Sequence, residues 1–192
     1  MNLITNPWKG LASYEEQDVD KFEFCGRTQA IGKYYSLITN NLISTLYGKT
    51  GCGKTSLLQV GLFPLLRREA YFPIMCRMSL KKKDETFSSY LQTRVQEEAD
   101  KNAIRIEASN IGIEQTEKDN QYDLWNYFYG HEFRNEAGHI VFPIIVFDQF
   151  EEVLINNRDE SVLLLKQINN LIGDDLLLPE DCYANFRVTI AL

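Results

Sequence analysis

The sequence predicts an α/β layer fold built on a mainly parallel sheet. Short apolar runs with β-branched residues alternate along the chain with segments of helical periodicity. The run before Asp148 is apolar on both faces, which is typical of strands in parallel sheets, because helices cover both sides of such sheets. The chain contains no internal repeat and no low-complexity segment, so a solenoid or fibrous architecture is not indicated.

The first predicted elements follow an irregular leader, Met1–Phe24, in which Asn6-Pro7 marks a turn. Thr28 can cap a helix that runs through Asn40, because apolar side chains recur there at helical spacing. The β-prone run Leu42–Tyr47 comes next and ends at a glycine, so we expect a short strand there.

The middle of the chain continues the alternation. A helix is predicted from about Lys54 to Arg68, with its leucines packing inward, and a second strand from Tyr71 to about Met78. Apolar residues between Phe87 and Ala99 lie at the spacing of an amphipathic helix. The polar stretch Arg105–Asn120 is expected to be a loop.

The last third of the chain supplies the remaining predicted elements. Leu124, Trp125 and Phe128 indicate a short helix, and the run ending at Asp148 indicates a strand. Pro143 cannot donate a ladder hydrogen bond, so we expect the well-paired part of that strand to begin after it. A helix over Val162–Ile172 and a strand over Phe186–Leu192 complete the order.

Composition excludes several classes of protein. The 192 residues carry a formal net charge of −7, which argues against broad binding to nucleic acid or to anionic membranes. The N-terminus lacks the pattern of a signal sequence, and no apolar run approaches the roughly 20 residues of a membrane span. The four cysteines are scattered without a CxxC pair, so neither a zinc site nor a disulfide framework is indicated. A soluble cytoplasmic protein is expected.

The strongest motif is GKTGCGKTS, Gly48–Ser56, which satisfies the P-loop pattern G-x-x-x-x-G-K-[ST] between a predicted strand and a predicted helix. Its glycines let the backbone curl so that successive N–H groups point at one anion, and the following helix adds the positive end of its dipole. Three glycines serve this purpose: Gly48, Gly51 and Gly53.

The side chains of the motif indicate a bound nucleotide with Mg²⁺. Lys54 is expected to reach the β- and γ-phosphates, and the Thr55 hydroxyl to ligate Mg²⁺. The other residues of the motif are expected to contribute backbone or peripheral contacts: Lys49, Thr50, Cys52 and Ser56. The sequence thus predicts a three-layer P-loop NTPase core.

Asp148 is the predicted acid on the magnesium side of this site, because it ends a buried strand. The residues between the P-loop helix and this strand leave room for one further strand, as in P-loop ATPases where an extra strand separates the phosphate-binding strand from the acid-bearing one. In those proteins a glutamate directly after the aspartate polarises the attacking water. Here Gln149 holds that position, and the glutamates are Glu151 and Glu152. Each is either a candidate general base or an acid at a helix N-terminus.

Three stretches together resemble the STAND NTPases, in particular a bacterial branch of that family. They are NPWKGLASYEEQDVDKFEFCGR, the P-loop continuing into TSLLQVGLFPLL, and VFDQFEEV. The resemblance implies a signal-transduction ATPase that holds ADP when off, exchanges it for ATP when a ligand is sensed, and then oligomerises to activate an effector domain. Several bacterial relatives act in antiviral defence or regulation.

The resemblance also assigns a role to FCGR, which matches the motif before the first core helix on the adenine side of the nucleotide. Phe24 and Arg27 are therefore candidate base or phosphate contacts. The family usually continues with an acidic residue where this chain has Thr28, which puts a local salt bridge in doubt. A surface salt bridge is the alternative role for Arg27.

The family's last core strand leads into a sensor arginine, a fifth strand, a winged-helix region and repeat domains, whereas this sequence ends at Leu192. The resemblance therefore implies an N-terminal leader over residues 1–27 that packs on an ATPase core, residues 28–192, truncated before its last strand. A sheet lacking one strand is expected to expose an edge or an apolar face.

Two other functions stay open. Because the sensor arginine is absent from this sequence, one alternative is a scaffold that binds nucleotide without turnover. A metabolic P-loop kinase would need an acceptor site and an arginine-rich lid, and Arg105–Asn120 offers one arginine only.

Overall fold

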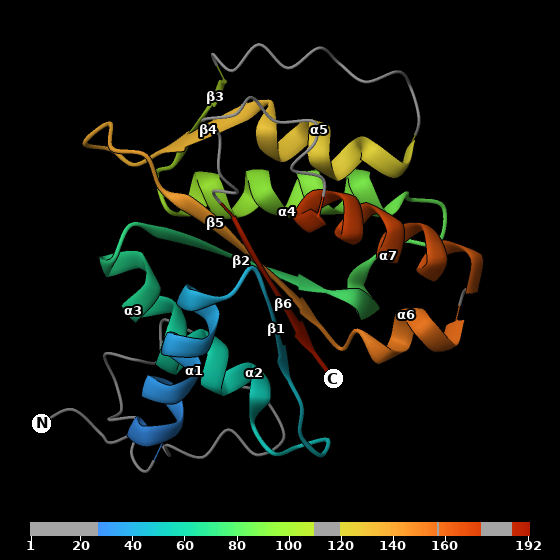
Figure 1. Cartoon of the computed structure of the whole chain (residues 1–192), viewed down its shortest axis with the longest axis horizontal. Helices are drawn as coiled ribbons and strands as arrows, with labels where there is room; N and C mark the ends of the chain where they lie inside the picture. The colour runs from blue at the N-terminus through green and yellow to red at the C-terminus, as the bar shows by residue number, and fades with distance from the viewer. Residues whose placement is uncertain (1–26, 110–119, 157, 174–185) are drawn as a thin grey trace, which may run out of the picture.

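A four-stranded parallel sheet forms the centre of the protein (Figure 1). The computed structural model describes residues 27–109, 120–156, 158–173 and 186–192. Within them the strand order is β1-β6-β5-β2. The strands are β1 (Ile43–Leu46), β6 (Arg187–Ala191), β5 (Phe142–Asp148) and β2 (Tyr71–Arg77). The predicted α/β class and parallel sheet are confirmed.

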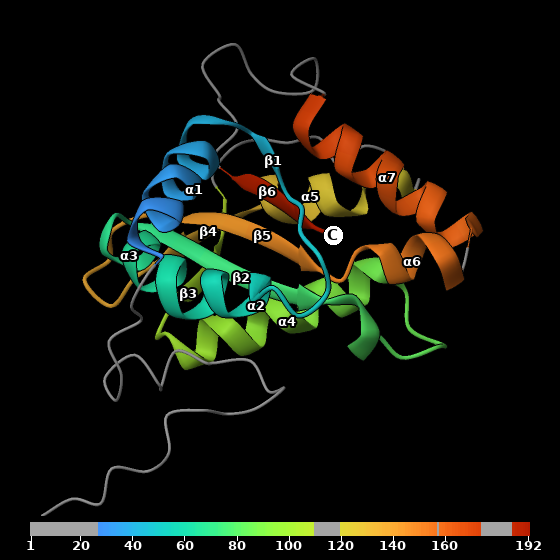
Figure 2. The ribbon, with the colours of Figure 1, turned by 90° about the horizontal axis from the view of Figure 1, so that it is seen from below.

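Helices cover both faces of this sheet, which gives the three predicted layers (Figures 1 and 2). One face carries α1 (Thr28–Asn40) and the helical segment after the P-loop, which consists of α2 (Lys54–Ser56), η2 (Leu57–Leu62) and α3 (Phe63–Arg68). The other face carries α4 (Phe87–Lys101), α5 (Asp123–Tyr129) and α7 (Arg158–Gly173).

The two layers of core follow from the alternation of side chains along the central strands. Ile144 and Val146 of β5 pack with Leu58 and Leu62 under α1. The alternate residues Ile145 and Phe147 belong to the larger core under α4, α5 and α7. Because β5 sends apolar side chains to both faces, it reads as a continuous apolar run rather than an alternating one.

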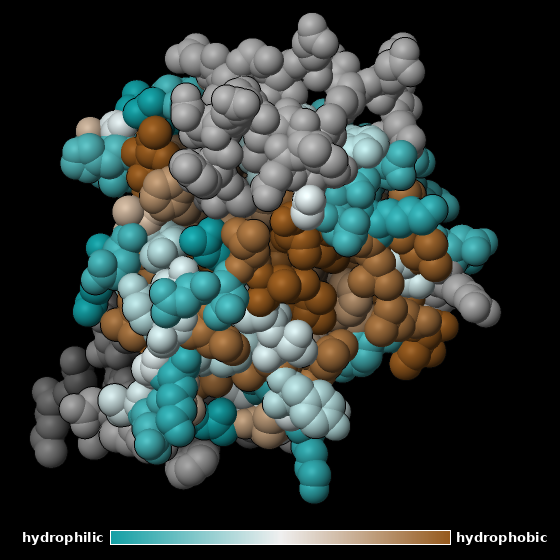
Figure 3. Space-filling model, in the orientation of Figure 1, coloured by the Kyte–Doolittle hydropathy of each residue, from teal (hydrophilic) through white to brown (hydrophobic). Residues whose placement is uncertain are grey.

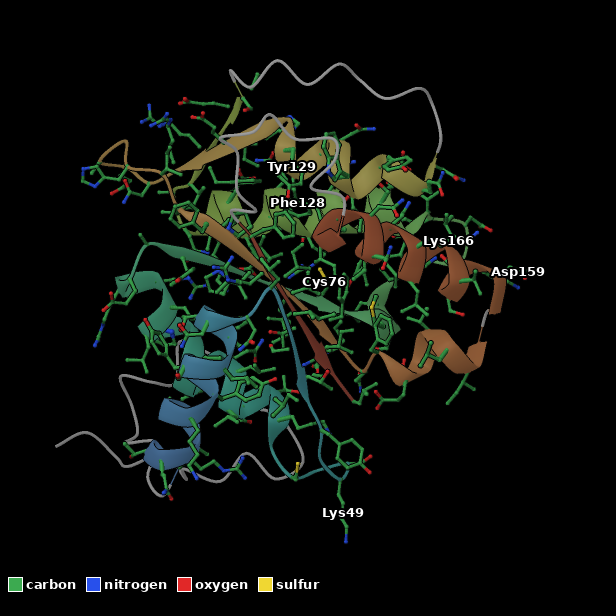
Figure 4. All side chains as sticks on the ribbon, in the orientation of Figure 1. Lys49, Cys76, Phe128, Tyr129, Asp159 and Lys166 are labelled. Atoms are coloured by element: carbon green, nitrogen blue, oxygen red, sulfur yellow. The ribbon has the colours of Figure 1, made fainter. Side chains whose placement is uncertain are left out.

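Cys76 of β2 lies near the middle of the sheet (Figure 4) and faces the larger core. Its side chain is completely buried, and this burial raises the pKa of the thiol. A protonated, enclosed thiol packs as a small apolar group.

The helical segment after the P-loop covers the predicted range, but its middle, η2, is a π-helix. Pro64 gives the physical reason, because it lacks an N–H for the carbonyl of Val60 and its ring would crowd that carbonyl in a regular helix. A wider turn before Pro64 avoids this conflict and carries the chain into α3.

A strand does separate the phosphate-binding strand from the acid-bearing one, and it is the last strand, β6. The strand between the P-loop helix and Asp148 in sequence, β2, pairs with the opposite side of β5. The expected start of pairing after Pro143 holds only toward β6, where the register begins at Ile144 and Arg187. Toward β2, pairing already begins at Phe142. Backbone N–H groups point alternately to the two sides of a strand. The N–H that Pro143 lacks would point toward the β6 side, and the pairing with β6 begins only at Ile144, so no ladder hydrogen bond is lost.

The prediction of a loop over Arg105–Asn120 is wrong at its start. Arg105–Ala108 forms β3, which pairs antiparallel with β4 (His131–Arg134) in a second, two-stranded sheet. Residues 110–119 lie outside the described residues. The remaining short elements are η3 (Met78–Leu80), η4 (Asn120–Tyr122) and α6 (Glu151–Asn156).

Exposed apolar side chains gather on the face seen in Figure 3, around its centre and right side. Edge strand β1 and helices α6 and α7 contribute large exposed residues: Leu42 and Ile43 at the start of the strand, and Leu154, Ile155, Val162 and Leu165 on the helices. In the described part of the chain, β1 has one neighbour, so its other side is a free sheet edge. None of the helices described there is long and apolar enough to cross a membrane.

Candidate functional site

The candidate site lies at the edge of the sheet where all four parallel strands end. β1 leads there into the P-loop, β5 ends on Asp148, and β2 ends on Arg77. The end of β6 is tied to the P-loop, because the Gly48 N–H donates to the Leu192 carbonyl at 3.3 Å. Residues that lie far apart in sequence therefore meet at one edge, where open parallel sheets bind their ligands.

The P-loop backbone depends on its glycines. Gly51 and Gly53 have φ values of 78° and 83°, a left-handed conformation that strains residues with a side chain. At Gly48, an added Cβ would lie 2.8 Å from the Cys52 sulfur. The N–H of Cys52 donates to the Lys49 carbonyl at 3.1 Å, which closes the turn. The loop thus has the tight curl expected of a phosphate cradle.

Lys54 lies inside this curl. Its ammonium donates to the Gly48 carbonyl at 2.7 Å and to the Lys49 carbonyl at 3.4 Å, so the cation is held over the start of the loop. Lys49 instead projects away from the protein (Figure 4). Thr50 and Cys52 are exposed, and Ser56 is buried. Of these side chains, Lys54 is the one held inside the curl of the loop.

Thr55 and Asp148 form the contact that joins the two sequence motifs. The Thr55 hydroxyl donates to Asp148 Oδ2 at 3.0 Å. Asp148 is 2% exposed, and buried carboxylates need such partners. The two oxygen ligands predicted for Mg²⁺ are therefore adjacent at the end of β5.

Arg77 is a member of the site that the sequence analysis missed. It is the last residue of β2 and lies in register with Asp148. Its Nε is 3.5 Å from Asp148 Oδ2, the oxygen that also accepts from Thr55. The only sequence signal was the basic residue at the end of YFPIMCR, and its meaning depended on knowing that β2 pairs with β5.

Arg27 contacts the P-loop from the start of α1. Its guanidinium donates to the Cys52 carbonyl at 2.5 Å and to the Gly53 carbonyl at 3.4 Å. In the described residues, this side chain therefore contacts the loop through the loop carbonyls. Phe24 lies outside the described residues.

The acids after Asp148 begin α6, as the helix-terminus alternative expected. Gln149 has a φ of 59° and accepts a hydrogen bond from the Ser79 hydroxyl at 2.9 Å. Glu151 and Glu152 are both half-buried in the first turn of α6. Among the residues that the structure describes, Glu151 Oε2 is buried without a hydrogen-bond partner, which distinguishes it from Glu152.

These residues fit a magnesium–nucleotide complex chemically. Mg²⁺ prefers oxygen ligands and commonly takes one or two from the protein and others from phosphate, which suits the Thr55 hydroxyl and the Asp148 carboxylate. A curled glycine loop with an enclosed lysine suits the phosphates. Arg27 donates to carbonyl groups of the P-loop from outside the loop, so these carbonyls do not need to face the anion.

The comparison with protein families agrees with this geometry. A family model described as novel STAND NTPase 1 matches residues 7–190, nearly the whole chain. No curated protein and no solved structure matches the chain significantly. The match extends from the leader across the P-loop and the acid strand to the last strand, and the fold has the parallel sheet that such a core requires. The chain therefore belongs to the novel STAND NTPase 1 family.

Proposed function

We propose that this chain is the ATP- and ADP-binding switch module of a signal-transduction ATPase. The observation that carries the proposal is the 3.0 Å hydrogen bond between Thr55 and Asp148. It joins a P-loop hydroxyl to an acid 93 positions later in the sequence, at the edge where parallel sheets bind ligands. Membership of a family of NTPases supports the same function.

Different side chains of the site would contact the phosphates, the Mg²⁺ ion and the P-loop backbone. Lys54 would exchange its bonds to the loop carbonyls for the β- and γ-phosphates. Thr55 and Asp148 would hold Mg²⁺, Asp148 directly or through water. A bound Mg²⁺ supplies charge neutralisation at the phosphate oxygens. Arg27 would keep the loop in its curled shape by holding the carbonyls of Cys52 and Gly53.

Glu151 is our candidate for activating the attacking water. Its Oε2 is buried and lacks a hydrogen-bond partner, and such an atom is costly unless a ligand or water occupies it. Glu152 shares the helix turn without that feature and is the natural control. A slow hydrolysis would suit a switch, whose product is a conformational state.

In the full-length protein, we propose that exchange of ADP for ATP controls oligomerisation and activates an effector domain. Sensor and effector domains outside this sequence would supply the input and the output. We propose antiviral defence or regulation as the setting, as the resemblance to bacterial STAND NTPases implies.

A second candidate, a nucleotide-binding scaffold without turnover, is favoured by one observation. Gln149 occupies the position directly after Asp148, where a water-polarising glutamate is expected, and its amide is bonded to Ser79. An amide cannot act as a general base, so binding without hydrolysis is consistent with this arrangement.

Binding is tested by titrating ADP and ATP into the purified chain and its variants in a calorimeter. Lys54→Ala should weaken binding at least about tenfold, since a charged phosphate contact is lost. Lys33→Ala removes an equal charge from the exposed face of α1 and should leave binding unchanged. Failure of the wild-type chain to bind either nucleotide would contradict the switch and the scaffold alike.

Turnover is tested by following phosphate release with Mg²⁺ present. Glu151→Gln should keep nucleotide binding and lose release, whereas Glu152→Gln should retain both. Equal release by Glu151→Gln and the wild type would remove Glu151 as the base. Binding without release in the wild type would favour the scaffold, and transfer of phosphate to a small acceptor would point to a kinase.

A further inference from the structure

Arg77 brings a permanent positive charge to the side of the site where Mg²⁺ is expected. Its Nε lies 3.5 Å from Asp148 Oδ2, and the parallel register places Arg77 directly opposite Asp148. The same oxygen accepts the Thr55 hydrogen bond. One carboxylate oxygen is thus shared between the hydroxyl ligand and a guanidinium.

The contact between Arg77 and Asp148 is an ion pair without an aligned hydrogen bond. Arg77 Nε is buried and has no hydrogen-bond partner within the described part of the chain, although the carboxylate is close. The Arg77 side chain is nevertheless 33% exposed, whereas that of Asp148 is 2% exposed. The arginine therefore has a route toward solvent, and the aspartate has none.

We propose that Arg77 is the counter-charge that Mg²⁺ must displace from Asp148, and that it sets the Mg²⁺ concentration at which the loaded site forms. This inference rests on the proposed function, since it concerns the same nucleotide site. Two cations cannot both approach one carboxylate oxygen without strong repulsion.

The consequence is a threshold Mg²⁺ concentration for loading the site. With Arg77 in place, Asp148 is neutralised and stable while buried, which avoids the cost of an unpaired buried charge. When Mg²⁺ and nucleotide bind, metal coordination replaces this ion pair. The free energy of breaking the ion pair therefore lowers the apparent affinity for Mg²⁺. Nucleotide contacts made by the P-loop alone do not involve this exchange.

The test is a Mg²⁺ titration of fluorescently labelled ADP bound to the chain, compared with ADP affinity in EDTA. Arg77→Gln should lower the half-saturating Mg²⁺ concentration by about three- to tenfold, because a partly exposed competing charge is removed. ADP affinity in EDTA should stay within about twofold of the wild type. Arg77→Lys, which retains the charge, should restore most of the wild-type Mg²⁺ dependence.

Arg94→Gln is the matched control. Arg94 lies on α4 and donates to the carbonyl of Met75, which is on the same strand as Arg77. Its ion pairs, however, are with Glu97 and Glu98. Its loss should leave the Mg²⁺ dependence unchanged. Arg77→Met keeps the aliphatic stem and replaces the glutamine variant if circular dichroism shows that the latter does not fold.

The outcomes separate the inference from the proposed function. An unchanged or raised half-saturating Mg²⁺ concentration in folded Arg77→Gln, with ADP still bound, would overturn the role of Arg77 alone. A fall in ADP affinity in EDTA would also overturn it, because Arg77 would then be a phosphate contact. If the wild-type chain binds no ADP with or without Mg²⁺, the proposed function fails and this inference fails with it.

Discussion

Gly53 shows how strongly a single residue constrains the site. Its φ of 83° is a left-handed conformation, and an added Cβ would lie 3.3 Å from Arg27 Nη2. Gly53→Ala should therefore cost about 1–2 kcal/mol of unfolding free energy and disturb the contact of Arg27 with the P-loop. Urea unfolding followed by circular dichroism measures the loss.

Gly32→Ala is the control, because Gly32 lies in the exposed part of helix α1 and a Cβ there meets nothing within 4 Å. The same substitution should stabilise the protein, by up to about 1 kcal/mol, since alanine favours a helix over glycine. Equal effects at the two glycines would contradict the backbone argument.

Residue identities at the site were predictable where the chemistry is local in sequence. Lys54 and Thr55 stand in one motif, and Asp148 ends an obvious apolar run. Arg77 was not predictable in this way, because its role requires the register between β2 and β5. The choice between Glu151 and Glu152 likewise depended on which oxygen lacks a partner after folding.

Between elements, the pairing of β1 with β6 contains a buried polar contact. Ser44 and Thr189 are opposite each other in the parallel register, and their hydroxyl oxygens are 2.9 Å apart. Thr189→Val should cost about 1–2 kcal/mol of unfolding free energy, because the buried Ser44 hydroxyl loses this partner.

A double-mutant cycle checks this contact. The double variant Ser44→Ala/Thr189→Val should lose less unfolding free energy than the sum of the losses in the two single variants, by about 0.5 kcal/mol or more. Additive costs would mean that the two hydroxyls do not stabilise each other across the strands.

The long helices and central strands were predictable because their apolar periodicity survives in the fold. Helix α1 covers the predicted range Thr28–Asn40, but the predicted cap is wrong, because Arg27 holds the N-cap position and Thr28 is the first helical residue. The strands β3 and β4 were missed, because these four-residue segments are largely polar and carry no apolar run, although Phe133 of β4 is buried in the larger core. The π-helical turn η2 follows from Pro64 within an otherwise regular helical pattern.

The two cores on opposite faces of the sheet each contain a buried tyrosine with a shifted pKa. Burial raises the pKa of Tyr34 and of Tyr90 from 10.0 to about 12. The unfolded chain releases these protons near pH 10, whereas the folded protein retains them. The stabilisation is thus present below pH 10 and lost as the pH rises toward 12.

We therefore expect the unfolding free energy to fall between pH 10 and pH 12, measured by urea unfolding at fixed ionic strength. Tyr90→Phe should reduce the slope, with Tyr47→Phe, which removes an exposed hydroxyl, as the control. A slope in Tyr90→Phe equal to that of the wild type would contradict the contribution of Tyr90.

The whole fold brings the P-loop and the acid strand together across β6, and the central claim is that this makes a magnesium–nucleotide site. The most direct test is calorimetric ADP affinity with Mg²⁺ and with EDTA in the wild type, Thr55→Ser, Thr55→Ala and Asp148→Asn. The account predicts that Mg²⁺ strengthens binding in the wild type and in Thr55→Ser, and that this gain is largely lost in Thr55→Ala and Asp148→Asn while binding in EDTA persists. A Mg²⁺ gain of equal size in all four proteins would contradict it.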